Sequence, residues 1–209
     1  MTTYSLLASA IFATAALALI ALAALHVLKP DIHPARTMIS QYALGEYGWV
    51  MALFFGALAA STGFLFFALI PHVSSVLGWI GLALLLAAAV GLAMAARFPM
   101  DPVSTPPAQM SFAGRMHGVA FMIGVPCQLF AVLLLSLVLG KQTSQASLPL
   151  LGLTAVIWLS LAVVIAVMLI VGPGKAPNPD GPERFLGWPN RLFMAAYGVW
   201  LMVVAWLTQ

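Results

Sequence analysis

Charged residues are scarce in this sequence: they make up 6% of its 209 residues, whereas 63% are hydrophobic. An ordinary soluble domain has about a quarter charged residues and less than about half apolar ones. A water-soluble fold of the present composition would expose far more apolar surface than soluble monomers do. The shortage of charge therefore excludes an ordinary soluble protein and indicates an integral membrane protein.

Cysteine is nearly absent as well. The single cysteine, Cys127, excludes an internal disulfide and a cysteine-rich metal site. It lies in an apolar run, where we expect it to be a small packing residue. The few basic residues form no stripe with interleaved aromatic residues, so the net charge of +3 does not indicate binding to nucleic acid.

Acidic and basic side chains are also missing from the middle of every long apolar run. Proton and ion pathways normally leave an ionisable side chain at mid-membrane depth. A retinal Schiff base would need a lysine there. The sequence therefore disfavours a proton or ion pump and a retinal photoreceptor.

Six apolar runs account for most of the chain, and each is long enough to cross a bilayer as a helix of about 20 residues. They cover Tyr4–Leu28, Trp49–Ile70, Val76–Ala96, Gly118–Leu139, Leu148–Val171 and Arg191–Leu207. The first run lacks the basic start and the following polar domain of a signal peptide, so we count it as a span. No run alternates as a barrel strand would, and helices satisfy their own backbone in lipid. The sequence predicts an all-α polytopic membrane protein, in which residues 1–209 form one bundle of six transmembrane helices with one polar loop face.

The connections between the runs are unequal in a regular way. Those after the second and fourth runs are short and nearly uncharged, whereas those after the first, third and fifth are long, proline-rich and charged. This alternation places the three long connections on one side of the membrane. The basic residues on that side are Lys29, Arg36, Arg97, Arg115, Lys175, Arg184 and Arg191. By the positive-inside rule we predict an inner-membrane, multi-pass protein with cytoplasmic long loops and both termini outside.

The long connections and nearby helix ends supply a set of polar residues that forms the candidate site. Its members are His26, His33, Arg36, Ser40, Tyr42, Asp101, Arg115, His117, Asp180, Glu183, Arg184 and Arg191.

Imidazole and carboxylate groups in this set suit Zn²⁺ or a similar divalent ion. The predicted ligands are His33, Asp101 and His117, and with His26 they could support a metal-bound water that hydrolyses a lipid at the bilayer surface. Their spacing matches no local metal-binding motif. The alternative is that the histidines lie at the interface and hydrogen-bond to loop carbonyl groups.

The arginines and the hydroxyl residues each allow two interpretations. Guanidinium groups at headgroup depth could bind an anionic lipid, or they could anchor the helices and pair with the five acidic residues. Ser40 and Tyr42 could supply a nucleophile or a hydrogen-bond donor, but Ser40 could equally cap the next helix.

Inside the spans, two further features attract attention. Pro126 and Gln128 predict a kink with a locally satisfied side-chain amide. Glycines within the spans are expected at close helix contacts. These glycines are Gly56, Gly63, Gly78, Gly81, Gly187 and Gly198.

Three segments carry a resemblance to a known family. They are HPARTMISQYALG after the first run, RFPMDP followed by GRMHG before the fourth, and GPERFLGWPNR before the sixth. With these segments in this order, nearly the whole chain resembles a bacterial and archaeal family of six-span membrane proteins without assigned function, domain-of-unknown-function family 998. The resemblance implies six helices and one polar face. The family often has an acid shortly after the serine of the first segment, where this chain has Gln41, and that difference counts against an enzymatic role.

The sequence leaves two classes of function open. The protein is either a non-catalytic membrane component, packing as an accessory subunit in a larger complex or binding lipid or pigment, or an interfacial metal-assisted lipid hydrolase. Membrane lipids and other membrane subunits are the expected partners. Bound lipid and a divalent metal ion are the cofactors to be considered.

Overall fold

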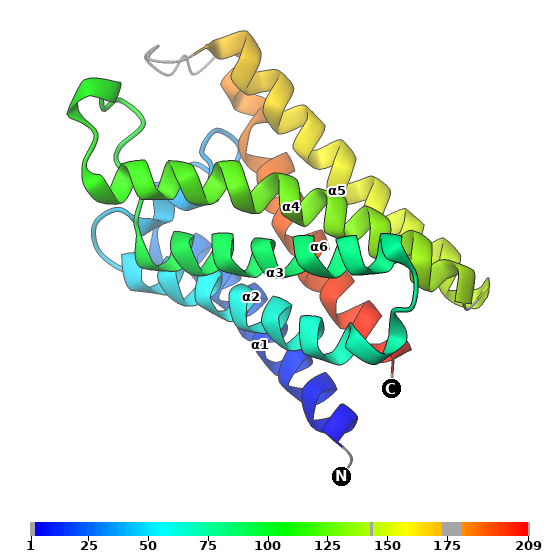
Figure 1. Ribbon diagram of the computed structural model, residues 1–209. Coiled ribbons are helices and arrows are strands. Elements are labelled where there is room, and N and C mark those ends of the chain that lie inside the picture. Colours follow the sequence, from blue (N-terminus) through cyan, green and yellow to red (C-terminus); the bar gives the residue numbers. More distant parts are fainter. Residues whose placement is uncertain (1–2, 143, 173–180, 209) are drawn as a thin grey trace.

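The computed structural model describes residues 3–142, 144–172 and 181–208 (Figure 1). Its long helices are α1 (Thr3–Leu28), α2 (Gly48–Leu69), α3 (Val76–Arg97), α4 (Phe112–Gln142), α5 (Ser144–Val171) and α6 (Gly187–Leu207). Short 3₁₀ helices lie between them: η1 (Ile39–Ala43), η2 (Ile70–His72), η3 (Pro107–Gln109) and η4 (Pro182–Phe185). All six long helices in the described residues are long and apolar enough to cross a membrane, which confirms the expected fold.

The helices form a closed ring in chain order. Each packs against the next one along the chain, and α6 returns to pack against α1. The first two long connections and the described part of the third (residues 181–186) lie at one end of the bundle, called here the long-loop end, and the short link after α2 and the end of α4 lie at the other (Figure 1). This confirms the single polar face expected from the alternation of connection lengths.

Helix α4 begins six residues before the expected Gly118, because its start is capped. The Ser111 side chain accepts a 3.0 Å hydrogen bond from the Gly114 backbone N–H. Such a cap satisfies an amide at the start of a helix, where no preceding turn can do so. The polar residues before the apolar run therefore continue the helix. Helix α6 likewise begins at Gly187, which places Arg191 one turn inside it.

Glycines bring α3 and α4 into backbone contact. A Cβ atom added to Gly91 would lie 2.5 Å from the Cα atom of Gly124. Small residues of this kind let transmembrane helices approach closely. The sequence-based list of packing glycines omitted both residues.

The predictions for the other glycines had mixed success. A Cβ atom added to Gly81 would collide with the Leu135 side chain, and one added to Gly187 would collide with the Pro34 carbonyl oxygen. Both glycines therefore lie at close contacts, as expected. The expectation was wrong for Gly63, which has nothing within 4 Å, and for Gly56, whose nearest neighbour would be 3.9 Å away.

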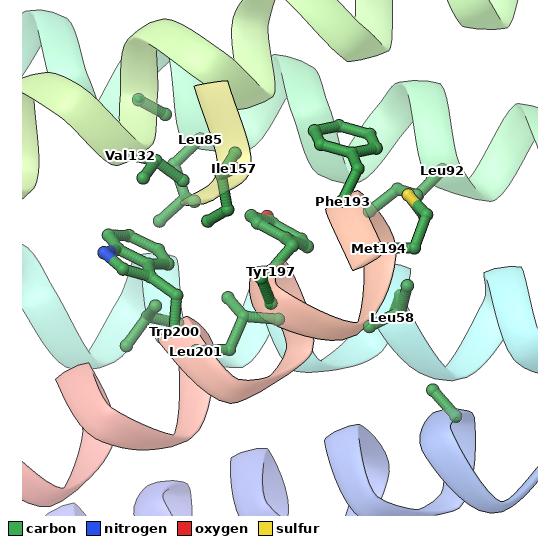
Figure 2. Close-up of a cluster of buried hydrophobic side chains, with 14 of the residues drawn as sticks. Leu58, Leu85, Leu92, Val132, Ile157, Phe193, Met194, Tyr197, Trp200 and Leu201 are labelled. Carbon is green, nitrogen blue, oxygen red and sulfur yellow. The ribbon is translucent and has the colours of Figure 1, made fainter. Parts of the chain in front are cut away.

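Buried hydrogen bonds connect the middle of α6 to the neighbouring helices. The indole N–H of Trp200 donates to Ser136 of α4 at 2.9 Å, and the hydroxyl groups of Tyr197 and Thr62 of α2 lie 2.9 Å apart. Figure 2 shows both aromatic rings inside an apolar cluster that includes Val132 and Ile157. Since lipid offers no hydrogen bonds, these contacts fix how α6 is rotated in the bundle.

Candidate functional site

Arg191 is the centre of the polar network at the long-loop end. Its side chain is only 4% exposed. Nε donates to His26 Nε2 at 2.8 Å, Nη1 to the Thr37 carbonyl at 2.7 Å and the Gly187 carbonyl at 3.1 Å, and Nη2 to the Tyr42 hydroxyl at 3.0 Å. Four of the five guanidinium N–H groups are thereby used. One buried cation thus joins α1, the first long connection and α6.

The hydrogen bonds of His26 determine the form of its ring. Nδ1 lies 2.8 Å from the Leu22 carbonyl oxygen, which can only accept a hydrogen bond. The hydrogen must therefore be on Nδ1, which leaves the lone pair on Nε2 free to accept from Arg191. His26 is a neutral imidazole with both nitrogens occupied.

The aromatic ring of Tyr42 adds to this arrangement. The Arg191 Cζ atom lies 5.3 Å from the ring centroid, within the range of a cation–π contact. Lys29, which is 6% exposed, approaches the same residue from its backbone side, where Nζ donates to the Tyr42 carbonyl at 3.2 Å and also to the Leu44 carbonyl. Among the side chains that the structure describes, the partners of both buried cations are uncharged.

Two further hydrogen bonds hold the first long connection against α6. The Ile39 backbone N–H donates to Asn190 Oδ1 at 2.8 Å, and the Gly187 N–H donates to the Ala35 carbonyl at 2.7 Å. A side chain at Gly187 would overlap this segment, so glycine permits the contact. Residues 35–44 are therefore fixed over the interior of the bundle.

Beneath this segment lies a cavity of about 60 Å³, bounded by residues 38–40 and by helices α2 to α6. Its polar lining residues are Ser40, His117, Gln128 and Asn190, and its larger apolar ones include Phe55, Leu92, Phe121, Leu161, Phe193 and Met194. Figure 2 shows three of these apolar side chains, Leu92, Phe193 and Met194, close together. None of the lining residues that the structure describes is charged.

The cavity is a narrow slot that follows α4. The α4 residues His117, Phe121, Gly124 and Gln128 line it at spacings of four, three and four residues, which places them on one face of the helix. His117 and Gln128 lie about 16 Å apart along the axis at 1.5 Å per residue. One end of the slot thus lies near the long connections and the other lies deep in the bundle.

Both ends of the slot have unused hydrogen-bonding capacity. At the outer end, His117 Nδ1 lies 2.9 Å from the Phe98 carbonyl, so in the neutral ring Nε2 carries the lone pair. The Ser40 hydroxyl has no partner among the described residues. At the inner end, Gln128 is 2% exposed and its Nε2 has no partner in the described part of the chain. The expected locally satisfied amide is therefore wrong.

Comparison with known proteins bears on the family. A family model described as protein of unknown function (DUF998) matches residues 12–207. The chain belongs to this family. No curated protein and no solved structure matches it.

The segments that carry the family resemblance meet at the network and the slot. The first segment contributes Thr37, Ser40 and Tyr42, the GRMHG segment contributes His117, and the GPERFLGWPNR segment contributes Arg191. In this member of the family, residues far apart in the sequence thus form one connected region at the long-loop end.

Other candidate residues lie apart from this region. Arg115 is exposed and donates to the Met110 carbonyl at 2.8 Å, while His33 and Arg36 are exposed on the first long connection. Asp180 lies outside the described residues, as do the side chains of Glu183 and Arg184.

Two of the open alternatives can now be judged. The Nδ1 atoms of His26 and His117 both bond to backbone carbonyls, as the structural interpretation of the histidines expected, although the carbonyl for His26 lies in its own helix. Ser40 lies within η1, and α2 begins at Gly48, so Ser40 does not cap that helix.

The predicted metal ligands are not grouped in the described part of the structure, where no set of three His, Cys, Asp or Glu side chains could hold an ion. Asp101 is engaged locally instead. Its two oxygens accept from the Ser111 backbone N–H at 2.7 Å and from the Ser111 hydroxyl at 2.8 Å. A divalent metal site stays a prediction.

Replacing Asp101 with alanine should destabilise the start of α4. The carboxylate orients the capping Ser111 and places a negative charge near the positive end of the helix. We expect a loss of about 1–2 kcal/mol in unfolding free energy, measured by thermal unfolding in detergent. Asp31→Ala is the control, because Asp31 is an exposed acid on another long connection. Equal effects of the two substitutions would contradict a capping role.

The sequence interpretation missed Lys29, Asn190 and Gln128. Lys29 was counted only as evidence for orientation, and Gln128 only as part of a kink. The position of Asn190 next to Arg191 in a polar segment was a signal that could have been used. No local pattern indicates that Gln128 faces a cavity.

Proposed function

We propose that this membrane protein is a non-catalytic lipid-binding protein that accepts an amphiphile with a linear apolar chain in the slot along α4. The observation that carries the proposal is the slot itself, since it lies inside a transmembrane bundle, is walled by apolar side chains and has free polar groups at its outer end. Mostly apolar cavities with a few convergent polar groups are the usual form of small-molecule sites.

The walls of the slot suit a chain. Helices α3 and α4 line it with small residues, opposite bulky residues from other helices. The small residues are Gly91, Ala95, Ala120 and Gly124. With a volume of about 60 Å³, the slot is narrow for an alkyl chain. Seating a chain therefore requires flexible side chains such as Met194 to change rotamer, which unbranched methionine does readily.

The polar groups favour binding over catalysis. Ser40 and His117 both line the slot, but no hydrogen bond joins them in the described structure. Nucleophilic catalysis by serine requires a base within hydrogen-bonding reach. A headgroup hydroxyl can instead accept a hydrogen bond from the Ser40 hydroxyl and donate one to His117 Nε2, with its chain extending inward. Association with other membrane subunits stays a separate prediction.

Filling the slot tests the proposal. Ala120 is 3% exposed and lines the slot, so Ala120→Leu should reduce co-purifying lipid by about tenfold. Native mass spectrometry of the detergent-purified protein measures the bound lipid. Ala93→Leu is the matched control, because Ala93 is exposed on the outside of α3.

Two results would contradict lipid binding in the slot: a wild-type protein without bound lipid, or equal lipid in both variants. Thermal unfolding shows whether Ala120→Leu remains folded. If it does not, Ala95→Leu fills the slot from α3 instead.

A further inference from the structure

We infer that the bound amphiphile carries a second oxygen, an uncharged hydroxyl or carbonyl group, on its chain at the depth of Gln128. This inference rests on the proposed function and specifies its ligand. The ligand class is an oxygenated lipid chain, with one polar group near the long-loop end and another deep in the bundle.

The side-chain amide of Gln128 is unpaired. Gln128 Nε2 is a hydrogen-bond donor buried among apolar helices, with no partner in the described part of the chain. Leaving a buried polar group unpaired is unfavourable, and buried polar groups in folded proteins are nearly always satisfied. Because the side chain lines the slot, an acceptor atom within the slot can reach it.

Charge is absent from the described lining of the slot. Among the described residues, no Asp, Glu, Lys or Arg side chain lines it, and Arg191 makes four hydrogen bonds outside it. A carboxylate or phosphate at the inner end would be a buried charge without a counter-ion, which is strongly unfavourable. An uncharged oxygen acceptor avoids this cost and bonds to the amide.

The length of the slot limits what a single polar group can reach. The two polar ends of the slot are about 16 Å apart along α4. They are joined by apolar walls, so a ligand with one oxygen can satisfy only one end. A chain with an oxygen at each end and a matching length satisfies both.

A series of α,ω-diols and mono-alcohols of equal length tests this inference. Chains of about eight to fourteen carbons bracket the span of roughly 16 Å. Each is titrated as a competitor against a fluorescent long-chain alcohol bound to the detergent-solubilised full-length protein. At one optimal length, we expect diols to bind about tenfold more tightly than mono-alcohols. At the shortest lengths, diols and mono-alcohols should bind equally, because a short chain cannot reach both polar ends.

Gln128→Leu provides the decisive variant. It should abolish the preference for diols over mono-alcohols of equal length, because the donor to the second oxygen is lost. It should also raise the melting temperature of the ligand-free protein, because it removes an unpaired buried polar group. A purely structural glutamine would give a lower melting temperature and no change in ligand preference.

The possible outcomes separate this inference from the proposed function. If mono-alcohols and diols bind equally at every length and Ala120→Leu blocks both, the slot binds lipid but the second oxygen is refuted, and water satisfies Gln128. If Ala120→Leu does not weaken the binding of any alcohol, or if no alcohol binds to the wild type, the proposed function itself fails.

Discussion

Arg191→Met should lower the unfolding free energy by about 3 kcal/mol, one of the largest single-residue effects expected in this protein. The substitution leaves three acceptors without their donor: His26 Nε2, the Thr37 carbonyl and the Tyr42 hydroxyl. Each buried group that loses its partner costs about 1 kcal/mol or more. The substitution also removes the cost of burying the Arg191 charge. This gain offsets only part of the loss, because the hydrogen bonds of Arg191 already stabilise its charge in the wild type.

The effect should be visible both as stability and as opening of the first long connection. Thermal unfolding in detergent measures the first, and limited proteolysis within residues 30–47 measures the second. Arg97→Met is the matched control, since Arg97 is exposed and its guanidinium lies over the ring of the neighbouring Phe98. Its effect should stay within about 0.5 kcal/mol.

A double-mutant cycle tests the cause. In the Tyr42→Phe background, which lacks the hydroxyl acceptor, Arg191→Met should cost measurably less than in the wild type, because the two side chains are in contact. Strict additivity, or an Arg191→Met protein as stable as Arg97→Met, would contradict the central role of this network.

The second large effect is expected at the contact between α3 and α4. Gly91→Ala places a Cβ atom 2.5 Å from the Gly124 Cα atom, and backbone cannot move aside as a side chain can. The two helices must separate, so we expect a loss of about 2–3 kcal/mol, in the range of overpacked cores. Thermal or denaturant unfolding in detergent measures this loss.

Gly63→Ala is the control for this prediction. Gly63 lies in α2 and has nothing within 4 Å of an added Cβ. Alanine favours a helix by up to about 1 kcal/mol over glycine, so this substitution should be neutral or stabilising. The two substitutions are chemically identical and should have opposite signs. A stabilising Gly91→Ala would show that the close approach of the backbones is not required.

The apolar runs by themselves determined the number of spans, the all-helical fold and the gathering of the long connections at one end. Each of these depends on local properties, since about 20 apolar residues in a row cross a bilayer whatever their neighbours are. The polar composition of the first long connection also identified the region that contains Tyr42 and lies beside Arg191. Orientation in the membrane stays a prediction.

Only the tertiary structure decided which polar groups meet. The helices are apolar on every side, so the sequence contains no amphipathic pattern to show which face of a helix turns inward. The pairing of Arg191 with His26 and the position of Gln128 in the slot both depend on helix rotation. That rotation is fixed by contacts between distant segments, such as Gly91 with Gly124, whose fit cannot be read from a single stretch of sequence.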